Sequence, residues 1–442
     1  MPDIVTTRVF SDGEKGITAT KMNDIIGSST IQTSFVSSKP VASSTTAGDN
    51  LLLLKSGGTY AQIDSSVFAS AMVPLLPDPN PKIWSARLRS FNAIGNPTFE
   101  VDQKNIGGLL TNMANGGPIL DRWNWNKLGT HTANGILVTP GFTLPGTNFL
   151  LSRSAFQITL TGQEASLASG DIMGFYQVIE GPRWRELSLD VHSLSLLVST
   201  SVAGLKFSVA LYDPGLSRSL VKLCTIPSAN TPTLIQLPNL PVWAAGGNFS
   251  MVPGVLGYGL RIVLAAGSTL IAPAADVWQT GSYYGAPGMD NFASKPVNST
   301  FTIGFIQHEP GAVCSTPMDC PFTQNYDDCL RYWCKSYPYA TKQGTVSSEG
   351  YEVWTNLESG TQLRGPTKFP KRMAKAPNAT INNIWAYDGT AGGVTLQPVG
   401  TNWGMATIVT NECGIAYMST GSALPATNAR WSLFHYIADT GW

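Results

Sequence analysis

A chain of 442 residues is too long for one ordinary domain, and its length predicts about three. Only 13% of the residues are charged, and 28 basic residues balance 28 acidic ones, which removes the electrostatic argument for a nucleic-acid partner. No apolar run approaches the roughly 20 residues that a membrane-spanning helix needs, so we expect no membrane insertion. Glycine and proline separate short apolar runs, a composition typical of an all-β protein with many turns.

Residues 1–80 are predicted to form an N-terminal anchoring region with little core of its own. Residues 18–27 could form a short capped helix, and the serine- and threonine-rich stretch 28–49 should be extended. Asn50–Lys55 and Thr59–Ile63, separated by Ser-Gly-Gly, predict a β-hairpin. A region so poor in core residues needs an external surface to fold against.

A stiff linker and a β-sandwich body are predicted next. Four prolines within residues 74–81 favour an extended, polyproline-like spacer. Residues 83–321 alternate strand-like runs with turn clusters, which predicts a two-sheet sandwich of the jelly-roll kind rather than a parallel α/β fold. The clearest strands are predicted at Ala155–Leu160, Leu187–Val191, Lys206–Leu211, Thr233–Leu237, Gly259–Val263 and Thr300–Ile306.

One short helix, within residues 322–338, is predicted to join the body to a second β domain. Asp327 and Asp328 would lie in its first turn and Arg331 and Lys335 in later turns, which matches the helix dipole. The residues that recur with helical spacing on its apolar face are Tyr326, Cys329, Leu330, Trp333 and Cys334.

The C-terminal part, residues 345–442, returns to short strands with glycine-rich turns. We interpret it as a smaller β domain at the distal tip, ending in a strand at Ala429–Ile437. No fixed-period repeat is present in the sequence, which disfavours a solenoid. The predicted fold class is therefore all-β throughout.

A series of motifs stands in one order along residues 91–338. They are Gly95-Asn96-Pro97-x-Phe99, Asp102-Gln103, Asp121-Arg122-Trp123, Phe175-x-Gln177-x-Ile179-Glu180-Gly181, and the run from Gln307-His308-Glu309 through Thr316-Pro317 and Pro321-Phe322 to Cys329-x-Arg331-Tyr332. In this order they resemble a family of bacteriophage tail-fibre and head-fibre appendage proteins. The resemblance implies a β-sandwich module, usually without a catalytic role. The chain departs from the pattern at His308-Glu309 and by adding Cys314, Cys320 and Cys334, so no role is carried over to those positions.

The resemblance also has implications for partners and location. Residues 1–80 resemble the N-terminal portions of phage fibre proteins, including Asn50-Leu-Leu-Leu before a glycine-containing turn. We therefore expect a virion protein, assembled in the host cytoplasm, whose N-terminus attaches to a phage tail, baseplate or capsid protein. Fibres of this kind are commonly threefold, so a homotrimer is expected, which would also cover exposed sheet edges.

The sequence gives little support for catalysis. It contains no Gly-x-Ser-x-Gly, no His-Glu-x-x-His and no phosphate-binding glycine loop. The carboxylate pairs Glu180 with Glu186 and Asp327 with Asp328 could flank a glycosidic bond, but structural roles are the preferred interpretation. We therefore expect no enzyme and no cofactor.

Four cysteines raise the question of zinc. Cys314, Cys320, Cys329 and Cys334 could supply a tetrahedral site, but the gaps of five, eight and four residues do not match the usual pairing of ligands. Buried thiols are the preferred interpretation, with a Cys314–Cys320 disulfide formed after lysis as an open alternative. No metal site is expected.

Aromatic residues beside polar loops give the best functional hint. Sugar rings pack their C–H faces on aromatic side chains, while amides and carboxylates bind the hydroxyls. The candidate glycan contacts are Trp123, Trp125, Trp278, Tyr283, Tyr284 and Trp403. The alternative is that these rings fill a core or a subunit interface.

The leading hypothesis is a phage fibre protein that binds a host surface polysaccharide or lipopolysaccharide. One alternative is a capsid or tail decoration protein without receptor binding. The other is a tailspike depolymerase that cleaves surface polysaccharide.

Overall fold

The computed structural model describes residues 50–56, 59–64 and 91–442, apart from 190, 244–245, 319, 356–360, 379, 381–382, 398–399 and 421–430. The chain divides into two units, Met1–Ser85 and Ala86–Trp442. In the first unit, Asn50–Ser56 (β1) pairs antiparallel with Thr59–Asp64 (β2), which confirms the predicted hairpin. The expected helix at 18–27, the extended stretch 28–49 and the proline linker at 74–81 lie outside the described residues.

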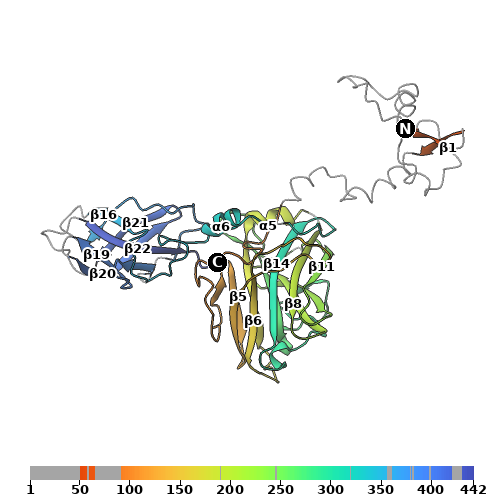
Figure 1. The fold of residues 1–442 in the computed structure, drawn as a ribbon, viewed down its shortest axis with the longest axis horizontal. Helices are drawn as coiled ribbons and strands as arrows, with labels where there is room; N and C mark the ends of the chain where they lie inside the picture. The colour runs from red at the N-terminus through yellow and green to blue at the C-terminus, as the bar shows by residue number, and fades with distance from the viewer. Residues whose placement is uncertain are drawn as a thin grey trace, which may run out of the picture. The chain divides into compact units, whose positions relative to one another are not determined.

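Two antiparallel sheets form the body of the second unit, which confirms the predicted all-β sandwich (Figure 1). The seven-stranded sheet contains, in spatial order, Trp278–Thr280 (β13), Arg218–Ile226 (β10), Leu205–Tyr212 (β9), Leu256–Ala266 (β12), Ile172–Glu180 (β7), Trp123–Leu128 (β4) and Pro118–Leu120 (β3). The five-stranded sheet contains Thr233–Leu240 (β11), His192–Thr200 (β8), Thr300–Pro310 (β14), Ala155–Gly162 (β6) and Thr132–Val138 (β5). Short 3-10 helices lie at Ser268–Leu270 (η2) and Phe292–Ser294 (η3).

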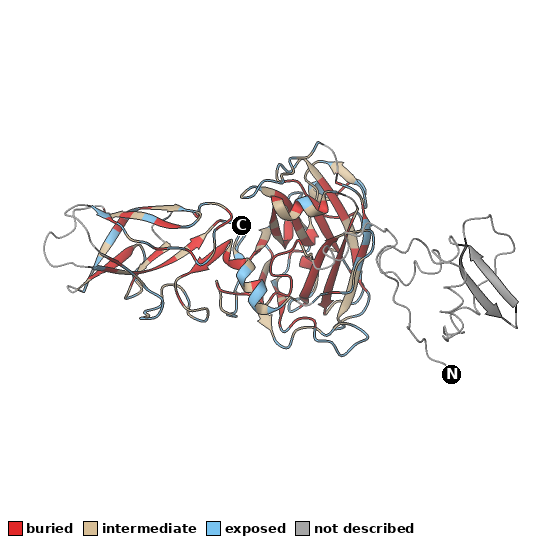
Figure 2. Cartoon of the chain, turned by 90° about the horizontal axis from the view of Figure 1, so that it is seen from above, coloured by how far each residue is buried: buried red, intermediate tan, exposed pale blue. Residues whose placement is uncertain are grey.

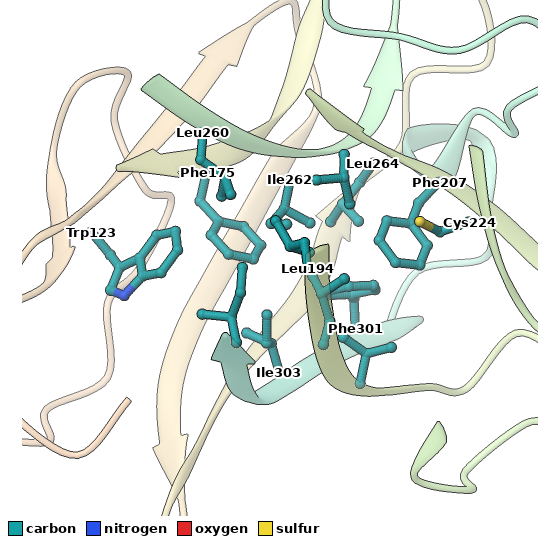
Figure 3. Close-up of a cluster of buried hydrophobic side chains, with 14 of the residues drawn as sticks. Trp123, Phe175, Leu194, Phe207, Cys224, Leu260, Ile262, Leu264, Phe301 and Ile303 are labelled. Atoms are coloured by element: carbon teal, nitrogen blue, oxygen red, sulfur yellow. The ribbon is translucent and has the colours of Figure 1, made fainter. Parts of the chain in front are cut away.

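Side chains from the facing surfaces of the two sheets fill the sandwich core (Figure 3). Phe175 of β7 and Phe301 of β14 approach across the core with ring centroids 6.4 Å apart, and Phe207 of β9 meets Phe301 edge-on at 5.3 Å. Figure 2 shows buried residues following the strands of this body. Each such ring stabilises the fold by about 1.5–3 kcal/mol through burial of apolar surface.

Five of the six body strands predicted from the sequence are confirmed, and the one at Leu187–Val191 is wrong. Gly181–Leu187 forms a short helix, α5, and the next strand, β8, begins only at His192. Proline in the first turn of α5 explains the difference, because a proline there needs no hydrogen-bond donor and already has a helical φ.

The predicted joining helix exists but is shifted and shorter. Helix α6 covers Phe322–Leu330, whereas Trp333–Lys335 (β15) pairs with Trp431–Asp439 (β22). Asp327 and Asp328 therefore do not lie in the first turn of the helix. They lie near its C-terminal end, where the helix dipole disfavours acidic side chains. Ion pairs compensate: Lys371 binds Asp327, and Arg183 binds Asp328.

The C-terminal part is built around one eight-stranded antiparallel sheet. Its spatial order is β15, β22, Gly393–Gln397 (β19), Thr401–Asn411 (β20), Gly414–Thr420 (β21) and Gln362–Leu363 (β17), and Glu352–Thr355 (β16) and Ile384–Ala386 (β18) also pair with β22. Strand β22 confirms the predicted C-terminal strand. The sheet takes its first strand from Trp333–Lys335, before the predicted start of this domain at residue 345. In the described part of the chain, no helix is long and apolar enough to cross a membrane.

Candidate functional site

A buried ion pair connects the end of β7 to the residues that follow α6. The Glu180 carboxylate accepts two hydrogen bonds from Arg331, at 2.6 Å from Nη2 and 2.9 Å from Nε. It also accepts one from the Tyr332 hydroxyl at 2.8 Å and one from the Gly254 backbone N–H at 2.8 Å. Burial alone would raise the pKa of Glu180, but these hydrogen bonds outweigh it and hold the pKa below its usual value. Glu180 is therefore an ionised structural group.

A second polar group lies against the first. The Arg122 guanidinium stacks on the Tyr332 ring, 3.6 Å from its centroid. Asp121 accepts hydrogen bonds from the Gln103 backbone N–H at 2.6 Å and from Gln103 Nε2 at 3.0 Å. Burial raises the pKa of Asp121 to about 7. Lys335 Nζ donates to the carbonyl oxygen of Gln103 at 3.1 Å, which ties β15 to the same network.

We call this network of Gln103, Asp121, Arg122, Glu180, Arg331, Tyr332 and Lys335 the junction. Gln177 extends the network, because its amide exchanges hydrogen bonds with the Gly95 backbone at 2.8 and 2.7 Å. Arg122 and Asn96 have φ angles of +73° and +51°, a region that costs non-glycine residues about 1–3 kcal/mol. Most of these residues belong to the motifs on which the fibre-protein resemblance rests. Their shared role is to join the sandwich to α6 and β15.

A cavity of about 390 Å³ lies beside the junction. Residues 91–97 form one wall. Hydrogen bonds hold this segment against β14, because Ala93 N–H donates to the His308 carbonyl and Ile306 N–H donates to the Pro97 carbonyl. Helix α6 forms another wall. The described lining residues are Phe91, Asn92, Ile94, Asn96, Pro97, Arg183, Gln307, Met318, Cys320, Gln324, Asn325 and Asp328.

The cavity wall combines amides with one charged pair. Arg183 Nη2 lies 2.9 Å from Asp328 Oδ2, and both side chains are partly exposed. Asn325 is only 1% exposed, and its Nδ2 donates to Asn96 Oδ1 at 3.2 Å. Its Oδ1 atom is buried without a hydrogen-bond partner and is not accessible from the cavity. Gln324 on α6 is exposed.

These groups suit binding better than catalysis. Amide, carboxylate and guanidinium groups can donate to and accept from the hydroxyls of a neutral ligand. Glycoside hydrolysis normally needs two carboxylates, and among the described lining residues Asp328 is the one carboxylate. The described part of the chain also holds no group of three or more His, Cys, Asp or Glu side chains that could bind a metal ion.

The hydrogen bonds and pKa shifts of the buried histidines and thiols indicate structural roles. Tyr258 Oη, His308 and His192 form a hydrogen-bonded chain, with Tyr258 Oη 2.7 Å from His308 Nδ1 and His308 Nε2 2.8 Å from His192 Nδ1. Burial lowers the pKa of both imidazoles, that of His192 to about 4, so both are neutral near pH 7. Burial also raises the pKa of Cys334 to about 12 and that of Cys329, as expected for buried thiols.

Three of the predicted glycan contacts are buried. Trp123 and Trp125 of β4 have no exposed surface and belong to the sandwich core. Figure 3 shows Trp123 beside Phe175, with the two rings 5.7 Å apart. Tyr284 is 5% exposed and packs against Tyr212. A ring with so little exposed surface offers no face to a sugar, so the expectation is corrected for Trp123, Trp125 and Tyr284.

The other three candidates are partly exposed and do not line the cavity. The Trp278 ring packs 5.2 Å from that of Trp243, and Tyr283 lies in the loop after β13. Trp403 packs against the core of the C-terminal sheet. Its polar neighbour in β20, Asn402, would be the residue to bind a sugar hydroxyl beside the ring. Successive strand residues point to opposite faces, so Asn402 and Trp403 cannot share a binding surface. A glycan-binding role for Trp278, Tyr283 and Trp403 stays a prediction.

No protein-family model and no curated protein sequence matches this chain. Among solved structures, it is similar to the family 11 carbohydrate-binding module from Clostridium thermocellum in complex with a β-1,3-1,4-mixed-linked tetrasaccharide, with 11% identity over 47% of this chain and 99% of the module and a TM-score of 0.25. It is also similar to TmCBM61 in complex with β-1,4-galactotriose (13% identity, 50% and 99% coverage, TM-score 0.25). A third similar structure is the enzymatically active domain of bacteriophage CBA120 tailspike protein 4 (14% identity, 49% and 21% coverage, TM-score 0.25). Likenesses at such TM-scores do not carry a function from one protein to another.

Proposed function

We propose that this chain is a non-catalytic fibre protein of a phage virion, which binds a host surface glycan in the cavity beside α6. The observation that carries the binding role is the composition of that cavity. Its volume of about 390 Å³ falls within the range of roughly 300–1,000 Å³ typical of small-ligand sites. Its wall offers amides, one carboxylate and one guanidinium, together with the half-buried Phe91 ring.

The chemistry of the wall favours a polyhydroxylated ligand. Gln324 can donate and accept at once, as a hydroxyl pair on a sugar ring requires. Asp328 can accept from a hydroxyl with lone pairs that its bond to Arg183 leaves unused. Phe91 supplies apolar surface for a C–H face. A neutral or weakly charged saccharide therefore fits better than a hydrophobic ligand.

The virion role is supported by the motif resemblance and by the division of the chain. Residues 1–80 would attach to a tail, baseplate or capsid protein, and three copies would form the fibre. A separate N-terminal unit, Met1–Ser85, is compatible with an attachment element distinct from the unit that contains the cavity, Ala86–Trp442.

Titration calorimetry of the full chain against purified host polysaccharide and lipopolysaccharide fragments tests the binding role. Gln324→Ala should weaken binding about five- to tenfold, since a neutral hydrogen bond contributes about 1 kcal/mol. Gln236→Ala is the matched control, because Gln236 is an exposed amide on β11 outside the cavity. Equal affinity for wild type and Gln324→Ala would contradict binding in the cavity.

Two further measurements separate the alternatives. A depolymerase would release reducing sugar from the polysaccharide, whereas we expect no release. A decoration protein would bind particles but no glycan. Electron microscopy of particles with labelled chains should place the protein on a fibre, and a label confined to the capsid lattice would favour the decoration role.

A further inference from the structure

A row of polar and aromatic side chains crosses the outer face of the seven-stranded sheet. Asn124 of β4 pairs in register with Tyr176 of β7, and Tyr176 pairs with Arg261 of β12. The neighbours of each along its strand point into the core, so these three point outward. We call Asn124, Tyr176 and Arg261 the outer row, and all three are partly exposed.

Three tyrosine rings hold the guanidinium of Arg261 in place. Its Cζ atom lies 3.9 Å from the ring centroid of Tyr284, 5.0 Å from that of Tyr212 and 5.3 Å from that of Tyr176. Tyr212 can lie so close because it pairs with Gly259, where a Cβ atom would come within 2.0 Å of the ring. The arginine is therefore positioned before any ligand arrives.

The charge of Arg261 is not neutralised within the described part of the chain. No ion pair there joins Arg261 to a carboxylate, and its Nε atom is buried without a hydrogen-bond partner. Burial raises the pKa of Tyr212 to about 12 although Arg261 acts in the opposite direction, so the neighbouring phenol stays neutral at pH 7. A fixed, partly exposed guanidinium with no counter-charge in the described part of the chain is suited to a carboxylate.

We infer that the outer row binds an acidic saccharide, with the sugar carboxylate at Arg261 and the rings lying along Tyr176 towards Asn124. Neighbouring strands are about 4.8 Å apart, so the row spans about 10 Å, comparable to a disaccharide. Tyr176 offers an aromatic face and Asn124 an amide for hydroxyls. No member of the row is among the described residues that line the cavity, so this is a second site, for a charged ligand.

The test compares a galacturonic acid trisaccharide with a galactose trisaccharide of the same linkage, by calorimetry on the full chain. We expect the acidic trisaccharide to bind about tenfold tighter or more, and its affinity to fall with added salt. Arg261→Met should remove the preference. Arg185→Met is the matched control, because Arg185 on α5 is an exposed arginine outside the row, with 67% of its side chain exposed. Equal affinities for the two trisaccharides, or an unchanged preference in Arg261→Met, would overturn the inference.

Two further variants keep the test decisive. If Arg261→Met does not fold, Tyr176→Leu decides, because it leaves the arginine in place and should still weaken acidic binding about tenfold. An affinity unchanged in Tyr176→Leu would overturn the inference. Gln324→Ala should leave acidic binding intact, so failure of the cavity site and failure of the outer row give different results. Competition by inorganic phosphate as strong as by the trisaccharide would show a simple anion site and overturn the saccharide assignment.

Discussion

Replacing Glu180 by alanine should destabilise the folded protein, because this carboxylate accepts four hydrogen bonds in the junction. The carboxylate is 4% exposed and accepts from Arg331, Tyr332 and the Gly254 backbone. Its removal leaves a guanidinium, a hydroxyl and an N–H group without their partner. Unpaired buried donors cost more than the pair itself contributes.

The magnitude follows from the exposure of the two partners. Breaking a buried ion pair from one side costs about 3–5 kcal/mol. The Arg331 side chain is 28% exposed, so water recovers part of its solvation in the variant. We therefore expect Glu180→Ala to lower the free energy of unfolding by about 3 kcal/mol, at the lower end of that range.

Urea unfolding of the full chain, followed by tryptophan fluorescence, measures the effect. Glu349→Ala is the control, because Glu349 is exposed, and it should change stability by less than about 0.5 kcal/mol. A double-mutant cycle with Arg331→Ala should give a coupling of about 1–3 kcal/mol. A coupling near zero, or equal stabilities for Glu180→Ala and Glu349→Ala, would refute the conclusion that the ion pair between Glu180 and Arg331 stabilises the fold.

Three other predictions can be tested separately: the first follows from the structure, and the other two follow from the resemblance to phage fibre proteins. Burial raises the pKa of Asp121 from 3.8 to about 7, so its protonated form stabilises the folded state at low pH, and this contribution is lost as the pH rises through about 7. Asp121→Asn should therefore lose less stability than wild type between about pH 5 and about pH 8 in thermal unfolding; parallel curves would contradict this. Deleting residues 1–80 should leave a soluble folded protein that no longer joins particles, and virion incorporation of the truncated chain would place the anchor elsewhere. Native mass spectrometry should give a trimer, which a stable monomer at micromolar concentration would exclude.

The strands that could be predicted are short segments rich in β-branched, aromatic and leucine residues. The run at Thr300–Ile306 lies within β14, a buried strand in the middle of its sheet. Strand β4, with the sequence Trp-Asn-Trp-Asn-Lys-Leu, was not predicted, although it alternates with the period of a strand. That alternation also shows that Trp123 and Trp125 share one face, away from the intervening Asn124. The period of the strand alone is therefore sufficient to place both tryptophans on one face.

The end of α6 could not be predicted from local pattern. The apolar spacing of Tyr326, Cys329 and Leu330 continues to Trp333 and Cys334, so nothing in the sequence nearby stops the helix. The structure ends it at Leu330 because the following residues pair with β22, about a hundred positions later. Tertiary hydrogen bonding overrides helical propensity here.

The cavity could not be predicted from the sequence for a related reason. Its wall is assembled from residues 91–97, Arg183, Gln307 and the segment around α6, which lie far apart in the chain. Arg261 was missed because a single arginine in an apolar strand carries no motif. Its significance comes from three rings on other segments and from the lack of a described counter-charge.

The charged residues of the junction, which carry part of the fibre-protein resemblance, are already engaged within the protein. Glu180 binds Arg331, and Asp121 accepts a hydrogen bond from Gln103. The Arg122 guanidinium is covered by the Tyr332 ring. Glu180, Arg331 and Asp121 use polar atoms within the protein, and the Nε and Nη1 atoms of Arg122 are buried, so a glycan could reach these groups only by disrupting the junction. Under the proposed function, recognition would then depend on side chains outside the junction, such as Gln324 in the cavity and the outer row on the sheet. A chain could keep the junction, and with it the architecture, while exchanging these surface residues to bind a different saccharide.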